Sequence, residues 1–220
     1  CAADRGIEVA AEFNTATIAQ LAQCDRMDAV IDFSAPASLP ALAAYVQRTG
    51  TPLVSGTTGY SDEEAARVNA LGSYAPVAVS ANFSIGVAVL KHLAAEAAAL
   101  LPDFDIEIIE THHRMKKDAP SGTAKLLLSA VNPDGTHPTV FGREGFAPRT
   151  AGEIGVHAVR GGTVAGVHTV SFFGDEEELS LTHRAESRRI FAIGALKTAE
   201  KLKDAPVGLH TLDELLFARR

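Results

Sequence analysis

Short apolar runs alternate with longer amphipathic stretches along the first half of the chain. Such runs predict buried parallel strands, and stretches with helical periodicity predict helices that cover the sheet. The expected strands are 7–13, 29–33, 52–55 and 77–80, and the expected helices are 34–48, 61–72 and 84–101. This alternation predicts an α/β fold with a Rossmann-like nucleotide domain.

Strands dominate the second half. An isoleucine-rich strand at 105–110 is followed by a helix that Ser121 caps. Runs at 154–160, 167–174 and 178–183 predict three further strands, which we expect to form an antiparallel portion joined to the first strand. The result is an α+β domain with one broad mixed sheet and a helix or two on one face.

A final helix at 188–201 is expected to return to the first domain. The predicted domains are therefore 1–84 plus 188–220, which would bind a dinucleotide, and 85–187, which would bind the substrate and form a tetramer.

The nucleotide domain lacks one expected part. A Rossmann-like domain opens with a strand and a glycine-rich turn that holds the cofactor pyrophosphate, yet the sequence has no G-x-G-x-x-G. We expect the chain to begin after that turn. The carboxylate that normally holds the ribose hydroxyls of NAD would then be Glu12, for which a solvent-facing strand residue is the alternative. The choice between NADH and NADPH stays open.

The overall charge and hydropathy of the chain exclude several classes of partner. The 220-residue chain has a formal net charge of −7, which argues against a nucleic-acid surface. It has no apolar run long enough to span a membrane and no N-terminal signal pattern, so we expect a cytoplasmic protein without a membrane partner.

Basic residues nevertheless gather in one segment. Residues 110–124 read E-T-H-H-R-M-K-K-D-A-P-S-G-T-A, with chargeable groups at His112, His113, Arg114, Lys116 and Lys117. The backbone N–H groups of Gly122 and Thr123 would lie in the first turn of the next helix, where they form an anion site. Cations on one side and a helix N-terminus on the other suit a ligand with two carboxylates.

Two alternatives for this segment are a solvated basic loop and a metal site. Adjacent histidines point differently from the i, i+4 pair of a zinc helix, and neither a cysteine nor a carboxylate falls at ligand spacing, so we expect no metal.

The segment resembles the signature of the 4-hydroxy-tetrahydrodipicolinate reductase family, formerly called dihydrodipicolinate reductase. Further motifs resemble that family in the same order along nearly the whole chain. They are D-F-S (32–34), G-T-T-G (56–59), A-N-F-S-I-G-V (81–87), H-A-V-R-G-G (157–162) and T-H-R-A (182–185).

The resemblance implies reduction of 4-hydroxy-tetrahydrodipicolinate to tetrahydrodipicolinate, in lysine and diaminopimelate biosynthesis, by hydride from NADH or NADPH. Hydride addition beside a ring nitrogen leaves negative charge, so a general acid should stand close to the ring. His112 is the candidate acid and Lys116 the second donor. His113, Gly122 and Thr123 are the candidates that bind the substrate carboxylates.

The resemblance also implies that two turns border the nicotinamide and ribose. Their residues are Gly56, Thr57, Thr58, Ser80, Ala81, Asn82 and Phe83. Arg160 would be a supporting residue near the active site, with a plain turn residue as the alternative. Members of the family are typically homotetramers.

Two other functions remain open. One is another two-domain NAD-dependent dehydrogenase, such as an aspartate dehydrogenase, which gives no reason for pairing the basic run with P-S-G-T. The other is a nucleotide-binding protein without catalysis, which the missing glycine-rich turn would permit.

Overall fold

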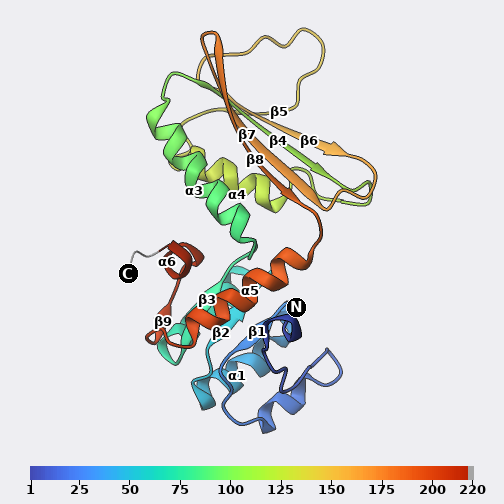
Figure 1. Ribbon diagram of the computed structural model, residues 1–220, viewed down its shortest axis with the longest axis vertical. Helices are drawn as coiled ribbons and strands as arrows, with labels where there is room; N and C mark the ends of the chain where they lie inside the picture. The colour runs from blue at the N-terminus through green and yellow to red at the C-terminus, as the bar shows by residue number, and fades with distance from the viewer. Residues whose placement is uncertain (218–220) are drawn as a thin grey trace. The chain divides into compact units, whose positions relative to one another are not determined.

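A computed structural model describes residues 1–217, and the chain divides into two compact units (Figure 1). One unit contains Cys1–Ile85 and the chain from Arg189 onward, and the other contains Gly86–Arg188. These limits differ by one residue from the domain limits expected from the sequence. The functions of the two units stay predictions.

The first unit is built on a four-stranded parallel sheet in the order β1-β2-β3-β9. Its strands are β1 (Val30–Asp32), β2 (Leu53–Ser55), β3 (Pro76–Val79) and β9 (Gly208–Leu209). Its helices are α1 (Leu39–Thr49), α2 (Asp62–Ala70), α5 (Arg189–Leu202) and α6 (Leu212–Phe217), with 3-10 turns at Ala3–Arg5, Ile18–Gln23, Pro36–Ser38 and Leu71–Ser73.

Both faces of this sheet are buried. Leu53 and Val77 pack with α1 and α2 on one face, whereas Val54 and Ala78 pack with α5 on the other. Successive strand residues point to opposite faces, so this division explains why the strands read as continuous apolar runs.

Local signals set the helix ends. Ser61 and Glu64 form a capping box at the start of α2, because each side chain accepts the other residue's backbone N–H. Gly50 ends α1 at φ +66°, a conformation that costs glycine little. A Cβ on Gly194 of α5 would lie 1.6 Å from the Phe83 carbonyl oxygen, so only glycine lets the helix approach this turn.

The strand predicted at 7–13 is wrong. This segment is extended but pairs with no strand in the described part of the chain. A strand is stabilised by its ladder partners and by the burial of one face, yet residues 8–12 are all exposed. Alanine and glutamate, which fill most of the segment, also favour strands little.

The second unit has a five-stranded mixed sheet in the order β5-β6-β4-β7-β8. Its strands are β4 (Asp105–His112), β5 (Thr139–Phe141), β6 (Ile154–Arg160), β7 (Gly166–Gly174) and β8 (Glu177–Ala185), and its helices are α3 (Ile85–Leu100) and α4 (Gly122–Val131). Both helices pack on one face, against a core that includes Ile108, Val156 and Val170 (Figure 1).

The antiparallel arrangement expected for all three later strands is wrong for β6. β6 runs parallel to β4, while β7 runs antiparallel on the other side of β4 and pairs with β8. Gly161 and Gly162 therefore join two strands that flank β4, and they do not form a hairpin turn between neighbours.

The predicted fold class is confirmed, with a parallel sheet in the first unit and a mixed sheet in the second. Within residues 1–217, no helix combines the length and apolar character needed to cross a bilayer.

Candidate active site

β4 carries the first part of the site. Its side chains alternate, so that Ile108, Glu110 and His112 all point to the face that α3 and α4 cover. Glu110 is 0% exposed and His112 is 8% exposed. A carboxylate buried in this way must find hydrogen-bond donors.

Glu110 accepts four hydrogen bonds. Arg160, which lies beside His112 in the register of β6 with β4, donates through Nη1 to Oε2 (2.7 Å) and through Nη2 to Oε1 (2.8 Å). His112 Nδ1 lies 2.5 Å from Oε2, and the Ser121 N–H donates to Oε1 (2.9 Å). Burial would raise the pKa of Glu110, but the bonds from Arg160, His112 and Ser121 outweigh it and lower that pKa.

The other ring nitrogen of His112 faces Gly166 at the start of β7. A Cβ at Gly166 would lie 3.1 Å from Nε2, so glycine keeps the space beside this atom open. Nε2 makes no hydrogen bond to any residue from 1 to 217. The ring thus presents one bound and one open nitrogen.

His168 of β7 lies opposite Glu110 and completes the buried cluster. Its ring packs edge-on to His112 with centroids 5.0 Å apart, and its Nε2 lies 3.1 Å from Ser121 Oγ. Nδ1 is buried and finds no partner among the residues described, so only one of the two ring nitrogens is hydrogen-bonded. Burial, and then the nearby His112, lower the pKa of His168 to about 4.

The N-terminus of α4 starts beside this cluster. Ser121 Oγ accepts the Ala124 N–H (3.1 Å), as expected of an N-cap. Gly122 is exposed, and a Cβ there would meet no atom within 4 Å, so a ligand can approach the backbone closely. Gly122 and Thr123 therefore lie where the sequence predicted an anion site.

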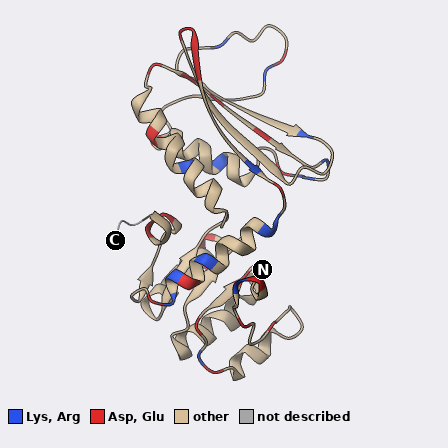
Figure 2. Ribbon diagram, in the orientation of Figure 1, with Lys and Arg blue, Asp and Glu red and all other residues tan. Residues whose placement is uncertain are grey.

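The other two residues predicted to act on the substrate, His113 and Lys116, lie in the segment between β4 and α4. Lys116 Nζ pairs with Asp118 Oδ1 at 2.8 Å, and His113 is partly buried. Arg160 Nη2 also donates to the Asp118 carbonyl (2.8 Å), which ties the segment to β6. Charged residues of both signs occur throughout the two units (Figure 2).

The two predicted cofactor turns leave the same edge of the parallel sheet in the first unit. Asp32, Ser55 and Val79 lie in register, so the segments that follow β1, β2 and β3 start side by side. Open α/β sheets bind ligands at this carboxyl edge. The turns are Gly56, Thr57 and Thr58 after β2, and Ser80, Ala81, Asn82 and Phe83 after β3.

Asp32, which belongs to the D-F-S motif but was given no role from the sequence, holds the first turn. It is 6% exposed and accepts from Thr57 Oγ1 (2.7 Å) and from the Ser34 N–H (3.0 Å). In the second turn, Ser80 Oγ donates to the Asn82 carbonyl (2.8 Å), and Phe83 packs edge-on to Phe33 at 5.8 Å. Thr57 and Phe83 are buried, whereas Thr58 and Ala81 are exposed.

Glu12 lies in the extended segment before β1, not at a strand end. It lines a hollow of about 1120 Å³ that reaches Asp32, Phe33 and Ser34 at the end of β1. This hollow and the open sheet edge lie where α/β sheets bind nucleotides, and a contact of Glu12 with ribose hydroxyls stays a prediction.

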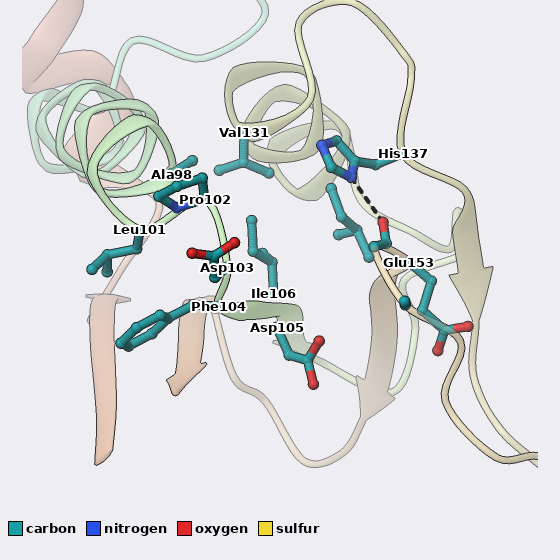
Figure 3. A pocket seen from close by; sticks show the side chains of 13 residues that line it. Ala98, Leu101, Pro102, Asp103, Phe104, Asp105, Ile106, Val131, His137 and Glu153 are labelled. Carbon is teal, nitrogen blue, oxygen red and sulfur yellow. Dashed lines mark hydrogen bonds between the residues drawn. The ribbon is translucent and has the colours of Figure 1, made fainter. Parts of the chain in front are cut away.

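A second hollow, of about 380 Å³, lies at the start of β4, the end of the strand away from His112 (Figure 3). Asp103 and Asp105 line it together with apolar side chains, and His137 Nδ1 lies 2.8 Å from the Gly152 carbonyl oxygen. None of the predicted site residues lines it. No group of three or more metal-ligating side chains occurs in the part of the chain that the structure describes.

Comparisons with known proteins give the same family for both halves of the chain. The family described as "Dihydrodipicolinate reductase, N-terminus" matches residues 3–83, and "Dihydrodipicolinate reductase, C-terminus" matches residues 86–216. Relatives named 4-hydroxy-tetrahydrodipicolinate reductase include one from Exiguobacterium sp., 45% identical over 86% of this chain and 76% of the relative. Another, from Thermomicrobium roseum, is 45% identical over 92% of this chain and 79% of the relative.

Solved structures give the same result. Dihydrodipicolinate reductase from Paenisporosarcina sp. TG-14, described as dipicolinate bound, matches with a TM-score of 0.70 and 26% identity, over 86% of this chain and 74% of that one. Amine dehydrogenase from Mycobacterium smegmatis, with a TM-score of 0.50 and 11% identity over 86% of this chain and 77% of that one, shares the fold alone. The resemblance seen in the motifs is thereby confirmed, and the chain belongs to the 4-hydroxy-tetrahydrodipicolinate reductase family.

Proposed function

We propose that this protein reduces 4-hydroxy-tetrahydrodipicolinate to tetrahydrodipicolinate with NADH or NADPH, in lysine and diaminopimelate biosynthesis. Family membership makes it an NAD(P)H-dependent oxidoreductase. The observation that carries the proposal is the pairing of a buried, carboxylate-bound His112 with the exposed N-terminus of α4. The dipicolinate bound to the Paenisporosarcina reductase is a planar dicarboxylate, which supports a ligand of the same kind here.

In the second unit, each predicted residue has a distinct role. His112 Nε2 donates a proton to the ring as hydride adds, and Lys116 is the second donor. His113 binds one substrate carboxylate, and the Gly122 N–H with Thr123 binds a carboxylate at the N-terminus of α4. Lys116 is paired with Asp118 in this structure, so the donor role of Lys116 requires that Asp118 give up this ion pair or share Lys116 with the ligand.

In the first unit, the reduced nicotinamide would supply the hydride. Gly56, Thr57 and Thr58 border the nicotinamide and ribose on one side, and Ser80, Ala81, Asn82 and Phe83 on the other. Glu12 accepts hydrogen bonds from the ribose hydroxyls.

Assembly, location and partners complete the proposal. As is typical of the family, the chain forms a homotetramer through the second unit. It works in the cytoplasm on a small dicarboxylate, without nucleic-acid or membrane partners. The net charge of −7 agrees with the absence of a nucleic-acid partner.

Steady-state oxidation of NADH and of NADPH by the purified protein, with freshly made substrate, tests the reaction and gives the cofactor preference. Pyridine dicarboxylate with NADH should raise the melting temperature more than NADH alone. A response to nucleotide alone would support a nucleotide-binding protein without catalysis, and oxidation of an amino acid instead would support an aspartate dehydrogenase.

Two substitutions separate proton transfer from binding. His112→Gln should lower kcat by about 100-fold or more and change KM little, because it removes an acid that acts in the transition state. Thr123→Val should mainly raise KM, because it removes a hydroxyl that binds a carboxylate equally in both states. A kcat within about twofold of the parent for His112→Gln would exclude His112 as the acid.

A further inference from the structure

The buried carboxylate of Glu110 needs an explanation beyond stability. A buried ion pair often contributes no more to folding than well-packed apolar side chains of the same volume. Glu110 nevertheless stands at 0% exposure on the central strand, beside the apolar core around Ile108. Its position next to the candidate acid points to a role in the chemistry.

The hydrogen bonds of Glu110 fix which nitrogen of His112 carries hydrogen. Both carboxylate oxygens accept bonds from the Arg160 guanidinium, which has no acceptor to offer and stays charged. An ionised carboxylate can only accept, so the nitrogen at 2.5 Å from Oε2 must be a protonated Nδ1. In the neutral ring, Nε2 is then the bare nitrogen, able to take up a proton and give it away.

The same carboxylate fixes the start of α4. Its Oε1 accepts the N–H of Ser121, the residue whose side chain caps that helix. One side chain on β4 thus holds both the imidazole ring and the helix whose first N–H groups would bind a substrate carboxylate. Arg160, from β6, closes the arrangement and also binds the Asp118 carbonyl in the intervening segment.

We propose that Glu110 is a positioning residue, which holds His112 as the Nδ1–H tautomer and ties that ring to the first turn of α4. This inference rests on the proposed function and deepens it. Glu110 touches neither substrate nor cofactor in this scheme, and it acts through His112 and Ser121. In this tautomer, Nε2 lies bare in the space that Gly166 keeps open. It takes up a proton from solvent, and the doubly protonated ring then donates that proton to the substrate.

The test is Glu110→Gln, which keeps the volume and can still accept the Ser121 N–H while removing the negative charge. We expect kcat to fall by about 30-fold or more and KM to change by less than about threefold, since a misoriented acid costs mainly transition-state stabilisation. Nitrogen-15 NMR of the imidazoles should show His112 as the Nδ1–H tautomer in the parent and a loss of that signature in the variant.

Glu107→Gln is the matched control. Glu107 lies on the same strand but on the opposite face, and it also pairs with a histidine and an arginine, His157 (2.7 Å) and Arg149. Its substitution removes the same charge and should leave kcat and the His112 signature unchanged.

An Nε2–H tautomer of His112 in the parent protein, measured at a pH where the ring is neutral, would overturn the inference, and this measurement needs no variant to fold. A kcat for Glu110→Gln equal to that of Glu107→Gln would overturn it as well. If the parent fails to oxidise either nicotinamide with substrate, the proposed function fails, while the tautomer assignment is still decided by NMR.

Discussion

At the residue scale, the site depends on a position that has no side chain. Gly166 stands at the first residue of β7, and its missing Cβ leaves His112 Nε2 accessible. Gly166→Ala should lower kcat by about tenfold, because a methyl group 3.1 Å from Nε2 must displace the ring or the ligand. The effect would be measured as kcat and KM with saturating NADH or NADPH.

Gly161→Ala is the control for that substitution. Gly161 lies in the neighbouring turn, where a Cβ would meet no atom within 4 Å, and its N–H bond to the His112 carbonyl is compatible with alanine. The control should keep the parent kcat. Equal losses in both variants would show that the space beside Nε2 is unimportant.

The buried His168 should give the fold a pH dependence. The pKa of His168 lies near 4 in the folded protein, because burial disfavours its charged form, against an ordinary 6.5 in the unfolded chain. The unfolded state therefore binds a proton first, and stability falls as the pH drops from 6.5 towards 4, by on the order of 3 kcal/mol for this group.

His168→Gln should flatten that dependence. Other groups near His168, including Glu110, His112 and Lys116, remain in the variant, so the difference between the two proteins reports His168 itself. The measurement is the melting temperature at steps between pH 7 and pH 4.5. Parallel curves for the two proteins would contradict the low pKa.

At the element scale, the cap of α4 should serve both folding and binding. Ser121→Ala removes the N-cap, which should cost about 1 kcal/mol, and it also disturbs the helix end where a carboxylate would bind. We expect a lower melting temperature and a KM raised by about threefold to tenfold.

Ser61→Ala offers the same chemical change on another helix. Ser61 caps α2 in the first unit, where its Oγ accepts the Glu64 N–H. This variant should lose similar stability but keep the parent KM for the dicarboxylate substrate. A KM that rises equally in both variants would argue against an anion site at α4.

The sequence predicted most elements because their signals are local. Short apolar runs mark the strands, and the Ser61 and Ser121 caps and Gly50 mark helix ends, all within a few residues of the observed ones. The direction of β6 was missed because pairing is decided between distant segments. β5 and β9 were not predicted.

The candidate site was likewise predicted only where its residues are close together in the sequence. His112, Gly122 and Thr123 belong to one contiguous motif, so the sequence could bring them together. Glu110 was not recognised as a partner of Arg160, fifty positions away, because only the sheet register brings the two side chains together. The alternation of Ile108, Glu110 and His112 was the available signal, since it places the carboxylate on the buried face.

At the scale of the whole molecule, the two sheets differ in how they are covered. Helices bury both faces of the parallel sheet, but α3 and α4 cover only one face of the mixed sheet. On the other face, the exposed fractions are 42% for Ile109, 48% for Val159 and 40% for Phe173. Within the described part of the second unit, no helix packs over this face, although Arg143 and Arg149 from the segment after β5 reach Glu107 there. Exposed apolar groups of this kind are typical of subunit interfaces.

We therefore expect this face to form the tetramer. Light scattering after gel filtration should give four copies of the 23.1 kDa chain, about 92 kDa.

Ile109→Glu should lower that mass, because Ile109 lies on the central strand and a buried, unpaired charge costs several kcal/mol. Leu100→Glu, at the 76% exposed end of α3, should leave the mass unchanged. A parent protein of 23.1 kDa in solution, or an Ile109→Glu variant that keeps the parent mass, would place the interface elsewhere or remove it.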